Sequence, residues 1–210
     1  MLYNKQVPIE QSALLVIDVQ DSFKSLPRWS RRNNPEFEKN ITRLVDVYRA
    51  AGLPVFYVLH SDEDPGWEKS SPHYKLMSFL APRVEEPVLH KITRNVFTST
   101  NLAELLLEKG VRRVVITGIQ TEQCCETSAR VAADLGYAVD FVTEATMTFP
   151  IAHPDDAAKE LGTNAIVERT EYALRGRFAK IRTVADLEEE LKGVFDRGER
   201  EINAVPAGTR

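Results

Sequence analysis

The sequence predicts an α/β protein with three layers, α/β/α, built around a six-stranded, mainly parallel sheet. Two observations support this class. Short apolar runs with the character of buried strands alternate with segments in which apolar residues recur every three or four positions. Gly, Pro and small polar residues separate most of these segments. A chain that alternates strands with helices in this way favours parallel strands and covers both faces of the sheet with helices.

Six segments have the pattern of strands. In the first, 13–17, all five residues are apolar, and the run ends at Asp18. Continuous apolar runs are typical of parallel strands that are buried on both faces. The predicted strands cover residues 13–17, 54–59, 88–91, 111–117, 137–143 and 179–183.

Helical segments lie between these strands. In residues 34–51, Ile41, Leu44 and Tyr48 share one face of a helix, and Gly52 is suited to end it. The predicted helices cover residues 34–51, 73–80, 102–109, 121–135, 155–162 with a continuation at 167–173, and 184–191.

Length and composition fit a single domain. The chain has 210 residues, of which 43% are hydrophobic and 28% are charged, and it is long enough to bury a large core. We expect one domain over residues 1–210, with its core at about 12–190 and a polar tail at about 193–210.

Composition also limits the partners and the compartment. The 27 basic and 31 acidic residues give a net charge of −4, which favours neither nucleic acid nor an anionic membrane surface. No apolar run is long enough to span a bilayer. The two cysteines are adjacent and provide no disulfide framework. We therefore expect a cytoplasmic protein that binds a small molecule.

Cys124 is the strongest candidate for a nucleophile, because it lies where a buried strand passes into a helix. A helix N-terminus offers unpaired N–H groups and the positive end of the helix dipole. Both effects predict an easily ionised thiol, and the same N–H groups can stabilise an oxyanion. Cys125 is turned by about 100° around the helix, so we expect it to serve packing.

Charged side chains follow two other predicted strands. Asp18 and Lys91 each lie at or just after a strand end, as Cys124 does. The carboxyl ends of parallel strands meet at one edge of the sheet, so these three residues are expected to converge there. Asp18 is the preferred base for the thiol. His60 and His90 also lie at strand ends and remain alternative bases.

Three segments together resemble the cysteine hydrolases of the isochorismatase-like superfamily, which includes nicotinamidases. They are LLVIDVQDSF at 14–23, HKITRNVF at 90–97 and GIQTEQCC at 118–125. The resemblance covers about residues 12–190 and implies a Rossmann-like strand order, 3-2-1-4-5-6. It also implies a homodimer or homotetramer.

The resemblance implies a catalytic triad of Asp18, Lys91 and Cys124. In such enzymes the Asp takes the thiol proton, the Lys holds the thiolate, and the Cys forms an acyl-enzyme. The resemblance further implies a cis peptide bond between Ile119 and Gln120, with the N–H groups of Gln120 and Cys124 directed at the oxyanion.

One segment departs from the pattern of nicotinamidases, which carry a metal-binding Asp-x-His after the second strand. Here residues 59–64 read LHSDED, without that spacing. We therefore expect no metal and no cofactor, and nicotinamide is a less suitable substrate. His60, Asp62 and His73 are the side chains that would bind a metal if one were present.

The loops after the first two strands are expected to line the substrate pocket. The predicted contacts with the substrate are Phe23, Trp29, Trp67, Tyr74, Arg94 and Gln120. The alternative is that the aromatic residues serve the core or an interface. Arg28, Arg31 and Arg32 form either a solvated loop or a group that attracts an anionic substrate.

The predicted function is hydrolysis of a C–N bond in a small amide, lactam or ureido compound through a thioester. Two alternatives stay open. One is a vinyl-ether hydrolase of the isochorismatase type, which needs no cysteine nucleophile. The other is a non-catalytic binding module with the same fold. The sequence does not identify the substrate.

Overall fold

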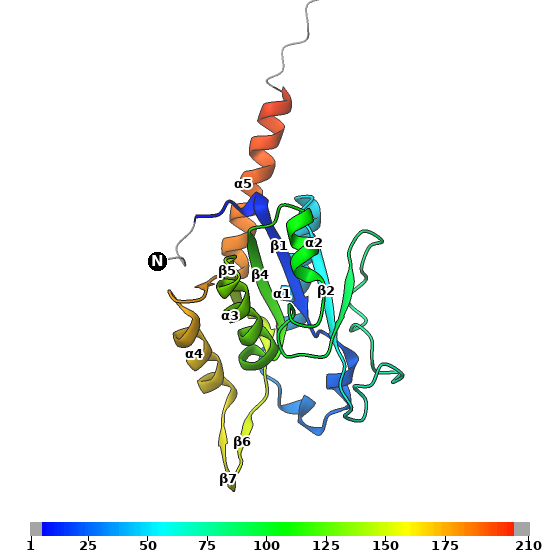
Figure 1. Cartoon of the computed structure of the whole chain (residues 1–210). Helices are drawn as coiled ribbons and strands as arrows, with labels where there is room; N and C mark the ends of the chain where they lie inside the picture. The colour runs from blue at the N-terminus through cyan, green and yellow to red at the C-terminus, as the bar shows by residue number, and fades with distance from the viewer. Residues whose placement is uncertain (1–5, 204–210) are drawn as a thin grey trace, which may run out of the picture.

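The computed structural model describes residues 6–203, and the side chains of all of these except 157 and 195–203. A six-stranded sheet forms its centre (Figure 1). Its strands are β1 (Ser12–Ile17), β2 (Val55–His60), β3 (Val88–Lys91), β4 (Arg113–Ile119), β5 (Ala138–Met147) and β8 (Lys180–Ile181). They lie in the order β3-β2-β1-β4-β5-β8, and every neighbouring pair is parallel. The predicted fold class and strand order are confirmed.

Helices cover both faces of the sheet. The helices are α1 (Phe37–Ala50), α2 (Leu102–Glu108), α3 (Glu126–Asp134), α4 (Thr163–Leu174) and α5 (Val184–Asn203). The alternation of side chains along β1 shows the two faces. Leu14 and Val16 pack with residues of α1 and α5, whereas Leu15 and Ile17 pack with residues of α2, α3 and α4. The core is therefore two apolar layers separated by the sheet.

Short helical turns lie before β1, after β1 and before α3. They are η2 (Ile9–Gln11), η3 (Asp21–Ser25), η4 (Pro27–Arg31) and η5 (Thr121–Cys125). The first three are 3₁₀ turns, and η5 is a π-helical turn that runs directly into α3. The predicted helix at 121–135 is thus a π-turn followed by an α-helix.

The prediction of a helix at 155–162 is wrong. Residues Ile151–His153 (β6) and Asp156–Leu161 (β7) form an antiparallel hairpin, and α4 begins only after it. The hairpin extends beyond the main body at the lower edge of Figure 1. Its sequence has ordinary helix formers, but pairing with the short strand β6 overrides that local preference.

Two further predictions need correction. Residues 73–80 contain no helix, because their backbone pairs with the loop after β1: Asp21 N–H donates to Lys75 O and Met77 N–H donates to Val19 O. The polar tail expected from 193 is helical as far as Asn203, since α5 continues to that residue. Positions 204–210 of that tail lie outside the described residues.

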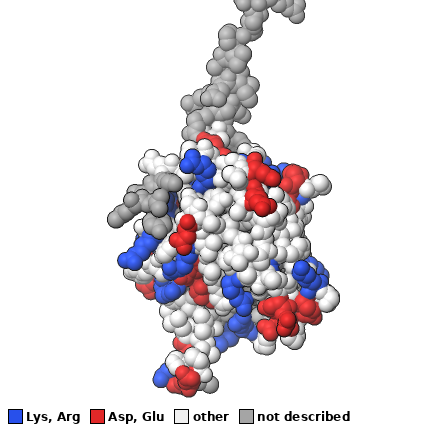
Figure 2. Space-filling model, in the orientation of Figure 1, with Lys and Arg blue, Asp and Glu red and all other residues white. Residues whose placement is uncertain are grey.

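Charged side chains are spread over the surface. On the face shown in Figure 2, basic and acidic side chains lie in small groups around a largely uncharged centre. Within residues 6–203, no helix combines the length and the apolar character needed to cross a bilayer.

The strand register brings the carboxyl ends of three neighbouring strands, β1, β2 and β4, to one edge. Ile17 of β1 pairs with Val58 of β2 on one side and with Gly118 of β4 on the other. Gly118 has a φ of 124°, and a Cβ there would lie 1.9 Å from the carbonyl oxygen of Ile17. Only glycine allows β4 to approach β1 so closely. This close approach sets the positions of the residues that follow both strands.

Candidate active site

Asp18 lies where the chain leaves the sheet. Its backbone turns into the left-handed region, with a φ of 54°, while its N–H still donates to Val58 O at 2.8 Å. The Gln20 amide then binds both polar groups of the His60 backbone: its Nε2 donates to His60 O at 3.0 Å, and His60 N–H donates to its Oε1 at 2.8 Å. These bonds hold the end of β1 against the end of β2.

Lys91 contacts the other two predicted catalytic residues, Asp18 and Cys124. Its Nζ lies 2.8 Å from Asp18 Oδ2 and 3.4 Å from Cys124 Sγ. Lys91 is 0% exposed and Asp18 is 1% exposed. A buried ammonium group is costly without a counter-charge, so the ion pair holds the two side chains together. The structure thus brings together the three residues predicted from separate strands.

Cys124 is held on the π-turn at the start of the helix. The Ile119–Gln120 peptide bond before the turn is cis, as expected. Gln123 and Cys125 both donate their N–H groups to Gln120 O at 3.2 Å. Ser128 Oγ donates to Cys124 O at 2.6 Å and accepts the N–H of Val96 at 3.2 Å. The nucleophile segment is therefore tied to the loop that follows Lys91.

Burial opposes the easily ionised thiol that the helix N-terminus predicts. Cys124 is 5% exposed, and burial raises its pKa to about 12. The Asp18 carboxylate adds to the rise in this pKa, and Lys91 opposes it. The resting site therefore holds a neutral thiol beside a carboxylate and an ammonium group.

The second oxygen of Asp18 is available to accept a proton. Both oxygens are buried and have no hydrogen-bond partner among residues 6–203, although Oδ2 forms the ion pair with Lys91. Oδ1 is therefore left without a partner, which is costly for a buried carboxylate oxygen.

The two histidines considered as alternative bases lie in different places. His60 is buried near Lys91, and burial lowers its pKa, so its ring is neutral at pH 7. Its Nε2 lies 3.2 Å from Arg94 Nη1 and 3.3 Å from Asp62 Oδ2. One tautomer satisfies only one of these contacts, as acceptor from Arg94 or donor to Asp62. His90 binds the Tyr74 hydroxyl through Nδ1 at 2.8 Å and does not line the cavity described next.

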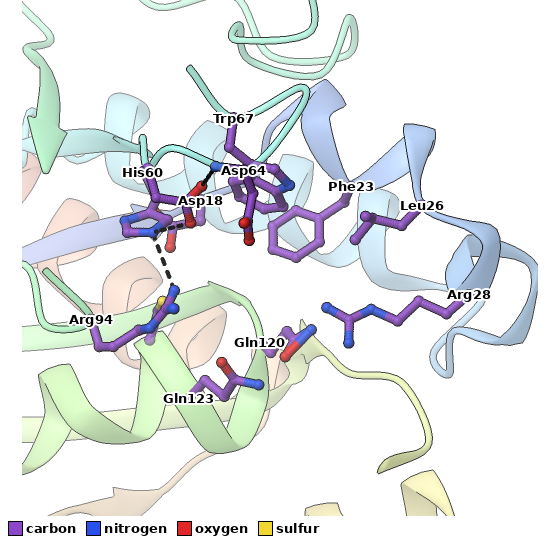
Figure 3. Close-up of a pocket in the computed structure, with 12 residues that line it drawn as sticks. Asp18, Phe23, Leu26, Arg28, His60, Asp64, Trp67, Arg94, Gln120 and Gln123 are labelled. Atoms are coloured by element: carbon purple, nitrogen blue, oxygen red, sulfur yellow. Dashed lines mark hydrogen bonds and ion pairs between the residues drawn. The ribbon is translucent and has the colours of Figure 1, made fainter. Parts of the chain in front are cut away.

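A cavity of about 550 Å³, including its open mouth, leads to Cys124 (Figure 3). Asp18 and Cys124 form part of its wall, so a small molecule that enters can reach the thiol. The lining residues are Asp18, Phe23, Leu26, Arg28, His60, Asp62, Asp64, Trp67, Arg94, Gln120, Gln123 and Cys124.

Four of the six predicted substrate contacts line this cavity: Phe23, Trp67, Arg94 and Gln120. Phe23 and Trp67 form an apolar wall, with ring centroids 4.7 Å apart in an edge-to-face arrangement. Leu26, Asp64 and Gln123 also line the cavity and were not singled out from the sequence. Their nearness along the chain to Phe23, Trp67 and Cys124 is the signal that could have found them.

Trp29 and Tyr74 do not line the cavity, contrary to prediction. Trp29 packs against Phe149, with ring centroids 6.3 Å apart, and lies under the guanidinium of Arg32. Tyr74 uses its hydroxyl to bind His90. Both rings serve the packing of loops, which the sequence pattern cannot separate from substrate contact.

The residues considered as metal ligands do not form a set. Asp62 contacts His60, but in the described part of the chain no three His, Cys, Asp or Glu side chains are placed to hold one metal ion.

The amino-acid sequence matches the family model described as Isochorismatase domain over residues 12–172. The chain belongs to the isochorismatase family. It is 29% identical over 180 residues to the isochorismatase family protein YrdC of Bacillus subtilis, covering 85% of this chain and 95% of that protein. It is 31% identical over 153 residues to nicotinamidase 3 of Arabidopsis thaliana, covering 66% of this chain and 74% of that protein.

Solved structures show the same relationship. An isochorismatase-family protein from Chromobacterium violaceum aligns with a TM-score of 0.81 and 26% identity, covering 90% of this chain and all of that one. The family predicted from three motifs is confirmed, and the family is one of hydrolases.

Proposed function

We propose that this protein hydrolyses a C–N bond of a small amide, lactam or ureido compound through a thioester on Cys124. One observation carries the proposal: the buried Lys91 ammonium contacts both the Asp18 carboxylate and the Cys124 thiol beside an open cavity. A purely structural ion pair needs neither the thiol nor the opening. The similarity to nicotinamidase 3, named for an amide substrate, supports the same chemistry.

The neutral thiol sets the order of proton transfers. As Cys124 Sγ attacks the carbonyl carbon, its proton passes to Asp18, and Lys91 stabilises the sulfur as it becomes negative. The C–N bond then breaks, and Asp18 returns the proton to the leaving nitrogen. Water attacks the thioester after giving a proton to Asp18, the C–S bond breaks, and the proton returns to sulfur.

The carbonyl oxygen needs donors while it is negative. In the proposal, the N–H groups of Gln120, which precedes the π-turn, and of Cys124, within it, fill this role. Because these donors belong to the backbone, their positions change little during the reaction.

The vinyl-ether reaction is the weaker alternative. By resemblance, enzymes of that type need no cysteine nucleophile, whereas here the thiol contacts the ammonium of the ion pair. A non-catalytic module would likewise have no need of an unpaired carboxylate oxygen beside the thiol.

A hydrolysis screen tests the proposal. Small amides, ureido acids and lactams are incubated with the protein, and release of ammonia or amine is measured. Wild type should cleave at least one class, and Cys124→Ala should cleave none while remaining folded by circular dichroism. Cys125→Ala is the matched control, since Cys125 is 0% exposed and does not line the cavity. It should keep most activity. Equal losses in both variants, or turnover by Cys124→Ala, would contradict the mechanism.

A further inference from the structure

Two arginines from separate loops line the cavity beside the nucleophile. Arg28 belongs to η4, and Arg94 follows β3 by three residues. Figure 3 shows both guanidinium groups pointing into the cavity, on the side of Gln120 and Gln123. Four side chains with N–H donors therefore share one side of the space that leads to Cys124.

Neither arginine has a carboxylate partner in the part of the chain that the structure describes. Eight other arginines do form such ion pairs: Arg31, Arg43, Arg49, Arg113, Arg130, Arg169, Arg175 and Arg182. Arg94 contacts the neutral ring of His60, and Arg28 lies over Phe149, 5.2 Å from the ring centroid. Both guanidinium groups therefore have donors available to a ligand in the cavity.

The cavity also contains carboxylates. Asp18 is paired with Lys91. Asp62 lies 3.3 Å from His60 Nε2, the atom that Arg94 Nη1 approaches to 3.2 Å, and it also accepts the N–H of Asp64 at 2.9 Å. Figure 3 shows Asp64 near Trp67 and Phe23, across from Gln120 and Gln123. Because carboxylates share the cavity with the two guanidinium groups, it suits a ligand with one negative charge better than a dianion.

The carboxyl group of Glu122 also lies close enough to Arg28 for an electrostatic interaction. Burial raises the pKa of Glu122, and one of its oxygens accepts the Thr148 hydroxyl at 2.5 Å. Glu122 does not line the cavity, so it leaves the guanidinium of Arg28 open to a ligand.

From this geometry we infer that the substrate carries a single carboxylate, which Arg28 and Arg94 bind while Cys124 attacks its amide or ureido carbonyl. Guanidinium and carboxylate groups match in shape and charge, so their hydrogen bonds are among the strongest in proteins. The inference rests on the proposed function for the place of attack. Its tests use binding and alkylation, so they do not depend on turnover.

The first test compares two ligands that differ in charge. Malonamate and malonamide are titrated by calorimetry into the Cys124→Ser protein, which keeps the cavity but cannot form a thioester. Malonamate should bind about tenfold more tightly or better, since a hydrogen bond to a charged group contributes about 1.5–3 kcal/mol. The preference should fall as salt is added. Equal affinities would overturn the inference.

Variants locate the effect. Arg28→Gln and Arg94→Gln should each reduce the preference for malonamate several-fold, and together they should remove it. Arg32→Gln is the matched control, because Arg32 follows the same turn, lies over Trp29 and does not line the cavity. A preference that survives the double variant, or that Arg32→Gln removes equally, would contradict the assignment.

A second measurement decides the question if neither malonate derivative binds. Iodoacetate and iodoacetamide have nearly the same size and differ in charge. Relative to free cysteine, Cys124 should favour iodoacetate by about tenfold, and Arg28→Gln with Arg94→Gln should abolish that preference. Equal preference for the two reagents would refute the inference of an anionic substrate but would leave the proposed function intact. If both reagents labelled Cys124 more slowly than the fully buried Cys125, the proposed function would instead be contradicted.

Discussion

Replacing Asp18 with Asn should make the Cys124 thiol easier to ionise and, at the same time, destroy catalysis. In the wild-type site, burial and the Asp18 carboxylate raise the pKa of Cys124 to about 12, and Lys91 opposes the rise. Asp18→Asn removes the negative neighbour and leaves the ammonium 3.4 Å from sulfur. The pKa of Cys124 should therefore fall.

The size of the effect follows from the charges involved. One charge at this range shifts a pKa by about 1–3, and a fall of about 2 raises the thiolate fraction about 100-fold at a fixed lower pH. A less basic thiolate is also less nucleophilic, which takes back about tenfold. Alkylation by iodoacetamide should thus accelerate about tenfold, while turnover falls by about 10²–10⁴-fold because the base is lost.

The assay is the rate of Cys124 alkylation between about pH 6 and pH 9, followed by peptide mass spectrometry. Removing the partner of a buried charge costs about 3–5 kcal/mol, so urea unfolding must first confirm that the variant is folded. Lys91→Met should shift the rate in the opposite direction. If Asp18→Asn reacted no faster than wild type, the proposed influence of the Asp18 carboxylate on the Cys124 thiol would be refuted. Near-normal turnover would favour His60 as the base.

Two other predictions concern stability. Gly118→Ala should lower the free energy of unfolding in urea by more than about 4 kcal/mol, because the new Cβ would lie 1.9 Å from Ile17 O. Gly136 has a φ of 92°, but no atom lies within 4 Å of a Cβ there, so Gly136→Ala should lower it by about 1–3 kcal/mol. Similar losses at both sites would be unexpected. Burial lowers the pKa of His60 below 6.5, so the unfolded state binds more protons just below that pH and stability decreases as pH falls through this window. His60→Asn should flatten this part of the pH–stability curve, and an unchanged slope would count against the buried neutral ring.

Much of the fold could be predicted from the sequence, because strands buried on both faces have continuous apolar runs. The edge where Asp18, Lys91 and Cys124 meet followed from the rule that parallel strands share a direction. The β6–β7 hairpin did not follow, since Ile151–His153 is too short to be recognised and its partner strand consists largely of helix-forming residues. The helix predicted at 73–80 was wrong for a related reason, because the backbone partners of this segment lie more than fifty positions earlier in the chain.

The site was less predictable than the fold. A helix N-terminus lowers a thiol pKa through local dipoles, but burial of Cys124 and the charge of Asp18 arise only when distant strands pack together. In the same way, Phe23 and Trp67 meet as a cavity wall while Trp29 supports a loop, and nothing in their local sequence separates these roles.

The Gln20 amide, which hydrogen-bonds both the N–H and the carbonyl of His60, separates the predicted catalytic residues from the loops that line the cavity. Its two hydrogen bonds continue the pairing of β1 and β2 beyond the last residue of β1, so Asp18 is fixed before the loops that line the cavity begin. Exchanging the segments after Gln20 and after Ser61 for those of a relative should then change the substrate preference while leaving Asp18, Lys91 and Cys124 in place.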